Sequence, residues 1–294
     1  MSMLLLDGNQ LSAILRKELL IRVREFCQND VRSPHLAAVL IGNNPASQAY
    51  VRNKIKACEE VGFASTLIRK PENTSQEELL HIIKGLNQDP TLDGYIVQLP
   101  LPRHLDEHAI NLAINPEKDV DGFHPYNFGK MALGLPTYLP ATPMGILMML
   151  DRYQIDTEGK HCVVLGRSNI VGTPIAILMS KKSKPGNATV TMAHSRTKNL
   201  KELCLTADIL IAALGIPKFV KADMVKAGAI VIDVGINRID DPMTTKGTRL
   251  VGDVDFEEVA LKVAAITPVP GGVGPMTITA LLENTWKAFS KQLS

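Results

Sequence analysis

HCVVLGRSNIVGTPIAILMS, residues 161–180 of the 294-residue chain, indicates the fold class of the second half. Its apolar start predicts a buried strand and its apolar end predicts a helix, so the residues between them form a turn at the carboxyl end of a strand. Gly166, Ser168 and Gly172 lie in this turn, where backbone N–H groups at the helix start can bind a pyrophosphate. The turn departs from the GxGxxG fingerprint, because Ser168 and Val171 replace the second and third glycines. Its place between a strand and a helix still predicts a dinucleotide site.

Strands and helices alternate on both sides of this turn. Apolar runs predict strands at 36–41, 65–69, 95–99, 161–165, 189–194, 208–214 and 229–234. Such alternation implies right-handed crossovers and mainly parallel sheets. We therefore expect an α/β protein of two domains with a cleft between them. The predicted limits are 1–120, completed by a C-terminal helix at 276–294, for the first domain and 141–270 for a Rossmann-type second domain.

The end of the next predicted strand indicates which dinucleotide binds. NAD-binding domains of this kind place an Asp or Glu there to bind a ribose hydroxyl, but this chain has His194-Ser195-Arg196-Thr197. A hydroxyl and a guanidinium suit a 2′-phosphate, with Arg167 as a second cation, so the segment favours NADP. The alternative is that Arg196 is an ordinary solvated loop residue.

NNPASQAYVRNKIKACEEVG, residues 43–62, predicts a helix that displays a tyrosine and a lysine together. An asparagine can cap its start, proline suits the first helical position, and Gly62 can end it. Tyr50 and Lys54 are four residues apart and lie on one flank. The ring can stack on a flat conjugated ligand, and a desolvated amine has a lowered pKa and can move protons near neutral pH. The alternative is a solvated edge of an amphipathic helix.

Two further polar residues lie in segments that suit a ligand site. DGYIVQLPLP, residues 93–102, predicts a short strand stopped by prolines, with Gln98 at its carboxyl end. The Gln98 carbonyl oxygen can hold a lysine amine there while its NH2 group faces a substrate. The loop PEKDVDGFHPYNFG, residues 116–129, carries Asp119 and Asp121, and Asp121 can accept hydrogen bonds from an amino-substituted heterocycle. An Asx turn is the alternative for both carboxylates.

The composition excludes several classes of function. A net charge of +2 with interspersed acids and bases provides no basic face for nucleic acid and no polybasic membrane patch. The seven histidines have no paired metal-ligand spacing, so we expect no metal site. The four cysteines form no CxxC pair and suit a reducing compartment. The sequence shows neither a signal peptide nor a membrane span, so we expect a cytoplasmic protein.

Five segments in one order carry a family resemblance. They are YVRNK at 50–54, QLPLP at 98–102, DVDGFH at 119–124, GRSNIVG at 166–172 and PVPGGVGPMT at 268–277. Together they resemble the bifunctional methylenetetrahydrofolate dehydrogenase/methenyltetrahydrofolate cyclohydrolase family in its bacterial form. The resemblance covers essentially the whole chain. It implies a folate-binding catalytic domain, an NADP-binding domain and a homodimer.

The resemblance also implies an activity and residue roles. The activity is NADP-linked oxidation of methylenetetrahydrofolate to the methenyl cation, followed by hydrolysis to formyltetrahydrofolate. Lys54 would handle the proton in hydrolysis, Tyr50 would stack on the folate, Gln98 would position Lys54, and Asp121 would bind the pterin end. The implied substrate-binding set adds Leu99, Pro270 and Gly271. The implied cofactor-binding residues are Thr142, Gly166, Arg167, Ser168, Val171, Ser195, Arg196, Gly235 and Ile236.

Two other classes of protein share part of this pattern. Another two-domain Rossmann dehydrogenase, for example one acting on amino acids, would use a lysine and an aspartate but would not explain Tyr50 and QLPLP together. A non-catalytic nucleotide sensor would keep the turn at Gly166 and would need neither Lys54 nor Gln98. A folate-dependent absorbance change on adding NADP discriminates among them.

Overall fold

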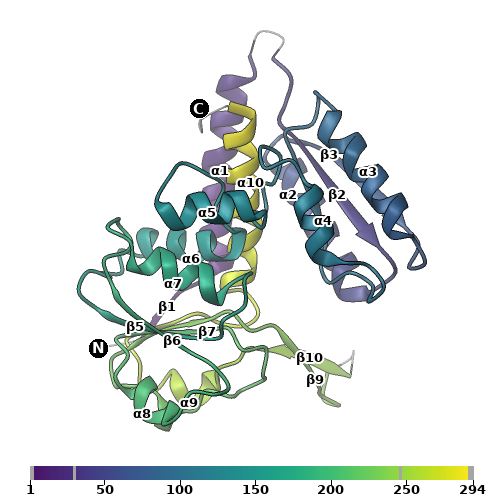
Figure 1. The fold of residues 1–294 in the computed structure, drawn as a ribbon. Helices are drawn as coiled ribbons and strands as arrows, with labels where there is room; N and C mark the ends of the chain where they lie inside the picture. The colour runs from purple at the N-terminus through teal and green to yellow at the C-terminus, as the bar shows by residue number, and fades with distance from the viewer. Residues whose placement is uncertain (1–2, 29–30, 245–246, 291–294) are drawn as a thin grey trace. The chain divides into compact units, whose positions relative to one another are not determined.

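The computed structural model describes residues 3–28, 31–244 and 247–290, and the chain divides into two compact units (Figure 1). The Lys54 unit consists of Ala13–Ala141 with Ile278–Ser294, and the Gly166 unit of Met1–Ser12 with Thr142–Thr277. The three points of division lie in helices α1 (Gly8–Phe26), α6 (Ala141–Arg152) and α10 (Val273–Ser290). Both units combine helices with a parallel sheet, which confirms the predicted α/β class. No helix in the described residues has the length and apolar character needed to cross a bilayer.

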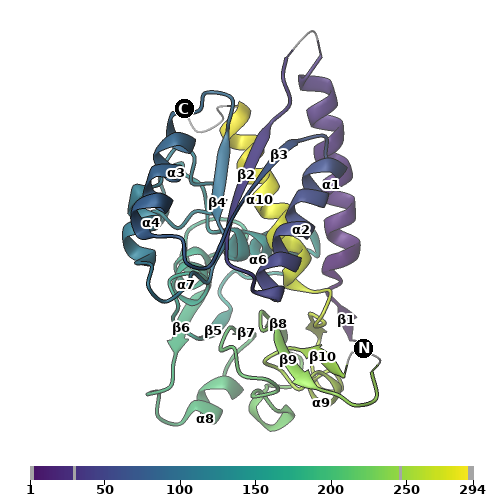
Figure 2. The ribbon, with the colours of Figure 1, turned by 90° about the vertical axis from the view of Figure 1, so that its right-hand side faces the viewer.

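The Lys54 unit is built on a three-stranded sheet of order β3-β2-β4. The central strand β2 (His35–Ile41) pairs in parallel with β3 (Ala64–Lys70) and with β4 (Gly94–Val97). Helix α2 (Pro45–Glu60) lies on one side of the sheet, and α3 (Gln76–Gln88) and α4 (Glu107–Ala113) lie on the other (Figure 2). The crossover helices thus cover both faces, as a buried parallel sheet requires.

Alternate residues of β2 and β4 face α3 and α4 and form a core there. The buried members of this core include Ala37, Val39, Ile41, Leu79, Ile83, Tyr95, Val97 and Ile110. Ser75 caps the start of helix α3, because its hydroxyl oxygen accepts a hydrogen bond from the Glu78 N–H at 3.1 Å.

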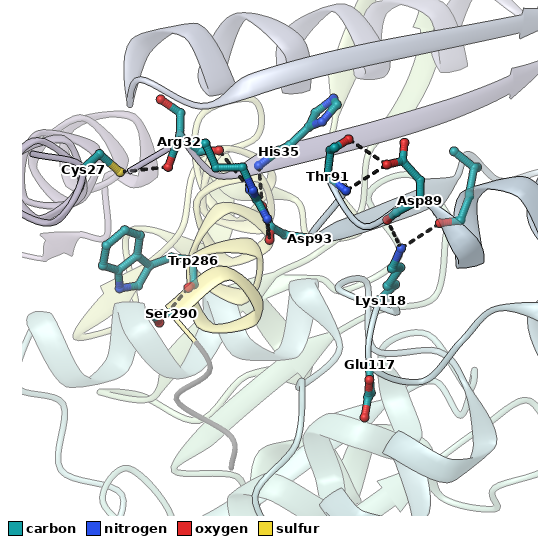
Figure 3. A network of polar contacts seen from close by, with 12 residues as sticks. Cys27, Arg32, His35, Asp89, Thr91, Asp93, Glu117, Lys118, Trp286 and Ser290 are labelled. Atoms are coloured by element: carbon teal, nitrogen blue, oxygen red, sulfur yellow. Dashed lines mark hydrogen bonds and ion pairs between the residues drawn. The ribbon is translucent and has the colours of Figure 1, made fainter. Parts of the chain in front are cut away.

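A polar network fixes the amino ends of β2 and β4 and the end of α3 (Figure 3). Both terminal nitrogens of Arg32 donate to the Asp93 carboxylate at 2.7 Å, and Asp93 also accepts from the His35 N–H at 2.8 Å. The Lys118 ammonium donates to the carbonyl oxygens of Leu86, in the last turn of α3, and of Asp89, just beyond it. These charge-assisted bonds hold the sheet and its connecting loops in register.

The Gly166 unit contains a six-stranded sheet of order β1-β11-β8-β7-β5-β6, with every pairing parallel. Its strands are β1 (Leu4–Leu5), β5 (His161–Leu165), β6 (Thr189–Ala193), β7 (Ile209–Ala212), β8 (Ile230–Asp233) and β11 (Ala265–Ile266). Because the chain leaves β5 first toward β6 and later returns to β7 on its other side, the strand order reverses at β5. Ligands of open α/β sheets bind at the carboxyl ends of strands at such a point.

Helices cover the two faces of this sheet (Figure 1). On one face lie α6 (Ala141–Arg152) and α7 (Gly172–Ser180), and on the other α8 (Leu200–Leu205) and α9 (Phe256–Val259), with a 3-10 turn at Ala222–Met224. A two-stranded antiparallel hairpin, β9 (Asn237–Asp240) with β10 (Thr248–Val251), extends from the unit.

The structure differs from the sequence prediction in several elements. The seven predicted strands are present, with ends shifted by up to two residues. The hairpin β9–β10 and the short strands β1 and β11 were not predicted, and α5 (Pro125–Leu133) begins inside the segment 116–129, which was expected to be a loop. The predicted first domain contained the N-terminus, whereas β1 pairs with β11 in the Gly166 unit. Two residues are too short to show a strand period, and β1 forms because its backbone completes the edge of an existing sheet.

Candidate active site

Helix α2 forms where the sequence predicted it and presents Lys54 toward the interior of its unit. The Asn44 side-chain oxygen accepts from the N–H groups of Ala46 and Ser47 at 2.9 and 3.2 Å, which caps the helix start. Gly62, just beyond the helix end, has φ +78°, in the left-handed region that favours glycine. Val51 and Lys54 are among the buried residues of α2, and Lys54 is 6% exposed.

The Lys54 ammonium meets the carboxyl end of β4. Its Nζ donates to Gln98 Oε1 at 3.2 Å, and the Gln98 N–H donates to the Val39 carbonyl oxygen, which continues the pairing with β2 by one residue. The Gln98 NH2 group, expected from the sequence to face substrate, donates to the Leu99 carbonyl oxygen at 2.7 Å. Since an NH2 group has two hydrogens, one stays available for a second acceptor. Gln98 is thus held at both ends of its amide.

Tyr50 and Asp121 complete this group of residues. Lys54 Nζ lies 5.8 Å from the centre of the Tyr50 ring, in the range of a cation–π contact. Burial raises the pKa of the Tyr50 hydroxyl, and the charge of Asp121 raises it further. Burial also raises the pKa of Asp121, while the charge of Lys54 opposes that shift. The structure therefore brings Tyr50, Lys54, Gln98 and Asp121 together in one unit.

Desolvation determines the proton chemistry of Lys54. Burial lowers the pKa of its amine from the usual value, and the carboxylate of Asp121 acts in the opposite direction. A lysine whose pKa is lowered in this way exists partly as the neutral amine closer to neutral pH, where it can accept a proton and return it.

Asp119 holds the loop that carries Asp121. Its two carboxylate oxygens accept from the N–H groups of Phe123 and His124 and from the Asn127 amide, at 3.2, 2.8 and 2.8 Å. The side chain is 2% exposed, and burial raises its pKa to about 6. Asp119 therefore has a structural role in the loop, but its backbone contacts lie four and five residues on rather than at the two-residue spacing of an Asx turn.

The turn after β5 has the geometry of a phosphate cradle. Gly166 has φ +114°, and a Cβ at this position would lie 2.2 Å from the Ala213 carbonyl oxygen, so only glycine fits between the ends of β5 and β7. The Ser168 hydroxyl oxygen accepts from the Val171 and Gly172 N–H groups at 3.2 and 3.4 Å, at the start of α7. The exposed turn, the close backbone packing and the helix start fit a bound pyrophosphate.

The end of β6 carries the residues predicted to select NADP. The His194 N–H donates to Thr197 Oγ1 at 2.9 Å, and His194 Nδ1 accepts from the Arg196 N–H at 3.1 Å, which shapes a tight turn. Ser195 and Arg196 are exposed on this turn, and Arg167 is exposed in the turn after β5. Hydroxyl and guanidinium groups at the ends of neighbouring parallel strands match a ribose 2′-phosphate.

The remaining residues predicted to bind cofactor or folate also lie in the Gly166 unit. Gly235 is buried and Ile236 is exposed in the turn between β8 and β9. The Thr142 hydroxyl lies 3.0 Å from that of Thr277. Pro270 and Gly271 precede α10, and the Gly271 carbonyl oxygen accepts from the Asn9 N–H at 3.0 Å.

Sequence reasoning did not identify two buried aspartates near this turn. Asp233 and Asp253 are 2% and 0% exposed, and both accept hydrogen bonds from backbone N–H groups. Burial raises the pKa of Asp233 to about 7, and the charge of Asp253 adds to the shift. The string GDVDF, residues 252–256, has no spacing that indicates this role. In the described residues, no group of three or more His, Cys, Asp or Glu side chains is arranged to hold a metal ion.

Comparison with known proteins covers both units. The model of the tetrahydrofolate dehydrogenase/cyclohydrolase catalytic domain matches residues 6–121, and the model of the NAD(P)-binding domain of the same proteins matches residues 140–293. The chain is 59% identical over 286 residues to the bifunctional protein FolD of Cytophaga hutchinsonii, covering 97% of this chain and 99% of that protein. It is 58% identical over 283 residues to the FolD of Flavobacterium johnsoniae, covering 96% of each.

Two solved structures share the fold. The FolD methylenetetrahydrofolate dehydrogenase/cyclohydrolase of Campylobacter jejuni is 48% identical, with a TM-score of 0.92 over 99% of this chain and 100% of that one. The Trypanosoma brucei enzyme, solved with NADP cofactor and inhibitor, is 36% identical, with a TM-score of 0.94 over 100% of this chain and 99% of that one.

Proposed function

The chain belongs to the tetrahydrofolate dehydrogenase/cyclohydrolase family, and we propose that Lys54 handles the proton in its hydrolytic reaction. The protein is a bifunctional enzyme that oxidises 5,10-methylenetetrahydrofolate with NADP and hydrolyses the methenyl product. The observation that supports the role of Lys54 is its buried amine, held 3.2 Å from Gln98 Oε1. Hydrolysis needs a group that accepts and returns a proton, and a desolvated amine suits that task.

Hydride transfer requires mainly orientation from the protein. NADP, when bound, supplies the hydride acceptor. The chain contributes the backbone turn at Gly166, which leads into the start of α7, and the turn between β8 and β9, where Gly235 is buried and Ile236 is exposed. A positioned reaction partner lowers the barrier by removing translational and rotational freedom before the chemical step. No proton from Lys54 is needed for this step.

Hydrolysis requires the proton chemistry of the Lys54 unit. Water adds to the methenyl carbon, and neutral Lys54 accepts a proton from it. The bond between that carbon and the ring nitrogen then breaks, and the Lys54 ammonium returns a proton to the nitrogen. The remaining hydroxyl proton on the carbon is released to solvent as the formyl C=O group forms. Gln98 keeps the lysine amine in place, and the Tyr50 ring provides an apolar face for the folate.

Asp121 binds the pterin end in this proposal. A carboxylate accepts hydrogen bonds from the amino group and ring N–H of such a heterocycle. The partly buried position of Asp121 strengthens these bonds, because little water competes for them. Leu99, Pro270 and Gly271 complete the proposed folate contacts.

We propose further that NADP is preferred to NAD. Ser195 and Arg196 are exposed where an NAD enzyme would carry an acid, and Arg167 is exposed in the neighbouring turn. The proposed cofactor contacts are Thr142, Gly166, Arg167, Ser168, Val171, Ser195, Arg196, Gly235 and Ile236.

A homodimer, implied by the family resemblance, is also part of the proposal, and sedimentation velocity tests it. Four free cysteines support a reducing compartment, and we propose the cytoplasm.

One experiment tests the function directly. Purified protein receives methylenetetrahydrofolate and NADP, and absorbance of NADPH and of the methenyl product is followed together. We expect NADPH to rise in step with oxidation while the methenyl species stays low because it is hydrolysed. A dehydrogenase of another substrate would produce no NADPH here, and a nucleotide sensor would bind NADP without turnover.

A further inference from the structure

Asp253 is the most heavily hydrogen-bonded buried carboxylate of the Gly166 unit outside the predicted site. Its side chain is 0% exposed and accepts four hydrogen bonds. One oxygen, Oδ2, accepts from the N–H groups of Leu214 and Gly215 at 2.6 and 2.9 Å. The other, Oδ1, accepts from the Ile216 N–H at 3.0 Å and from Asn237 Nδ2 at 2.8 Å. A carboxylate carries no hydrogen of its own when ionised, so it can satisfy all four donors at once.

These donors come from two segments at the carboxyl edge of the sheet. Residues 214–216 follow β7, and Asn237 begins β9 after the turn that leaves β8. Carboxyl ends of neighbouring parallel strands are where ligands of α/β sheets bind. Asp253 therefore joins two loops that border the same edge as the phosphate cradle at Gly166.

Gly235 is packed between Asp253 and Asp233. The Gly235 N–H donates to Asp233 Oδ1 at 3.0 Å, and a Cβ on Gly235 would lie 2.2 Å from Asp253 Oδ1. The N–H groups of Asp253 and Val254 donate to the two Asp233 oxygens, both at 2.9 Å. The turn at Gly235 and Ile236 is thus fixed from one side by Asp233 and supported from the other by Asp253.

We propose that Asp253 is a positioning residue for the NADP site, which fixes the turn at Gly235 and Ile236 against the loop 214–216. The inference rests on the proposed function, since it takes Gly235 and Ile236 as cofactor contacts. Asp253 itself is buried, so it acts through the backbone that it holds. Removing its charge leaves buried N–H donors without an acceptor, and the loops must then move to find water.

The substitution Asp253→Asn tests this directly, because it keeps the shape of the side chain. An asparagine has one acceptor oxygen, so its NH2 group must face two of the four donors in either orientation. We expect faster hydrogen exchange at the amides of residues 214–216 and a KM for NADP that rises roughly tenfold to a hundredfold. Hydrolysis of added methenyltetrahydrofolate, which uses Lys54 and no NADP, should stay near the unmodified rate and reports that the protein is folded.

Asp255→Asn is the matched control. It makes the same chemical change two residues away, but Asp255 binds the side chains of Lys218 and Lys221 and not the loop amides. We expect no change in exchange at residues 214–216 and an unchanged KM for NADP. An equal rise in KM in both variants would overturn the proposal in favour of a general loss of stability.

The double variant Asp253→Asn with Asn237→Asp provides a rescue. The new carboxylate at 237 accepts from the asparagine NH2 group at 253, whose oxygen still accepts from Leu214 and Gly215. We expect the KM for NADP to recover partly. If Asp253→Asn does not fold, Asn237→Ala removes one of the four bonds alone and should raise the KM severalfold with faster exchange near Asn237.

The outcomes separate this inference from the proposed function. Failure of the unmodified protein to turn over methylenetetrahydrofolate would refute the function, while exchange at residues 214–216 would still report on the hydrogen bonds of Asp253. Normal turnover by the unmodified protein, with an unchanged KM for NADP and unchanged exchange in a folded Asp253→Asn variant, would refute the positioning role alone.

Discussion

The site around Lys54 and the turn around Gly166 are built from different kinds of atoms. Around Lys54 the groups are side chains from a helix, a strand end and a loop: an amine, an amide, a ring and a carboxylate. Around Gly166 the region is shaped by the backbone: a glycine with φ +114° is followed by a helix start whose Val171 and Gly172 N–H groups donate to the Ser168 hydroxyl oxygen. The first region depends on which chemical groups are present, and the second depends on the path of the chain.

This contrast predicts different responses to substitution. Removing a functional group from the Lys54 region should abolish one reaction and leave the backbone unchanged. In the Gly166 region, adding a single methyl group should be damaging, because it changes the backbone that we propose binds the cofactor. Since the enzyme has two reactions, each one is a control for the other.

The largest effect is expected for Lys54→Met, which keeps most of the apolar stem and removes the amine. Hydrolysis should fall roughly a hundredfold to ten-thousandfold, the usual contribution of general acid–base catalysis. The oxidation step should continue, so the methenyl intermediate should accumulate in the coupled absorbance assay. Lys56→Met, an exposed lysine on the same helix, is the matched control and should hydrolyse normally. Equal loss of both reactions in a folded Lys54→Met variant would mean that Lys54 chiefly positions folate.

Gly166→Ala is the corresponding test of the backbone region. Its Cβ would lie 2.2 Å from the Ala213 carbonyl oxygen, in a conformation that L-residues rarely adopt. The conformation alone costs about 1–2 kcal/mol, and the clash displaces the cradle, so we expect NADP-dependent oxidation to fall by roughly a hundredfold. Hydrolysis of methenyltetrahydrofolate should be retained. Gly159→Ala shares the positive φ, here +68°, but meets no atom within 4 Å, so it isolates the conformational cost. If both variants lose oxidation equally, the close approach to Ala213 is not what matters.

Arg196→Ala tests the side-chain part of the cofactor region. A hydrogen bond to a charged group contributes roughly 1.5–3 kcal/mol, so kcat/KM for NADP should fall about tenfold to a hundredfold. The value for NAD, which lacks the 2′-phosphate, should be nearly unchanged. Lys198→Ala removes an exposed cation two residues away and should affect both cofactors little. Equal use of NADP and NAD by the unmodified enzyme would contradict the proposed preference.

The same contrast explains what could be predicted from the sequence. The helix at 43–62 was predictable because its cap, its glycine end and its apolar spacing are all local. The turn after β5 was predictable because glycine spacing between a strand and a helix is local too. Both signals lie within one continuous segment of chain, which is what patterns along a sequence can report.

Contacts between distant segments could not be predicted in this way. Strand β1 forms only because β11, far along the chain, offers an edge, and the hairpin β9–β10 has no alternation strong enough to mark it. Asp253 looks like any loop acid, yet it binds residues 214–216 and Asn237. Asp119 and Asp121 are two positions apart in one loop, and only the fold shows that Asp119 binds backbone while Asp121 lies near Lys54.

The smallest expected effect concerns the scaffold of the Lys54 region rather than its chemistry. Asn44→Ala removes the side-chain oxygen that accepts from Ala46 and Ser47 at the start of α2. Loss of such a cap costs about 0.5–2 kcal/mol of folding free energy. Trp286, the chain's one tryptophan, is 4% exposed and belongs to the same unit as α2, so its fluorescence reports unfolding of that unit.

We expect the urea midpoint of the Trp286 transition to fall in Asn44→Ala while hydrolysis at saturating substrate is unchanged, because Lys54 lies in the third turn of α2, away from its first. Asn43→Ala, an exposed asparagine one residue earlier, is the matched control and should leave the midpoint in place. A large loss of hydrolysis in a folded Asn44→Ala variant would mean that the Lys54 region depends on the exact backbone as much as the Gly166 region does. Such a result would contradict the distinction between the Lys54 region, which depends on side-chain groups, and the Gly166 region, which depends on backbone conformation.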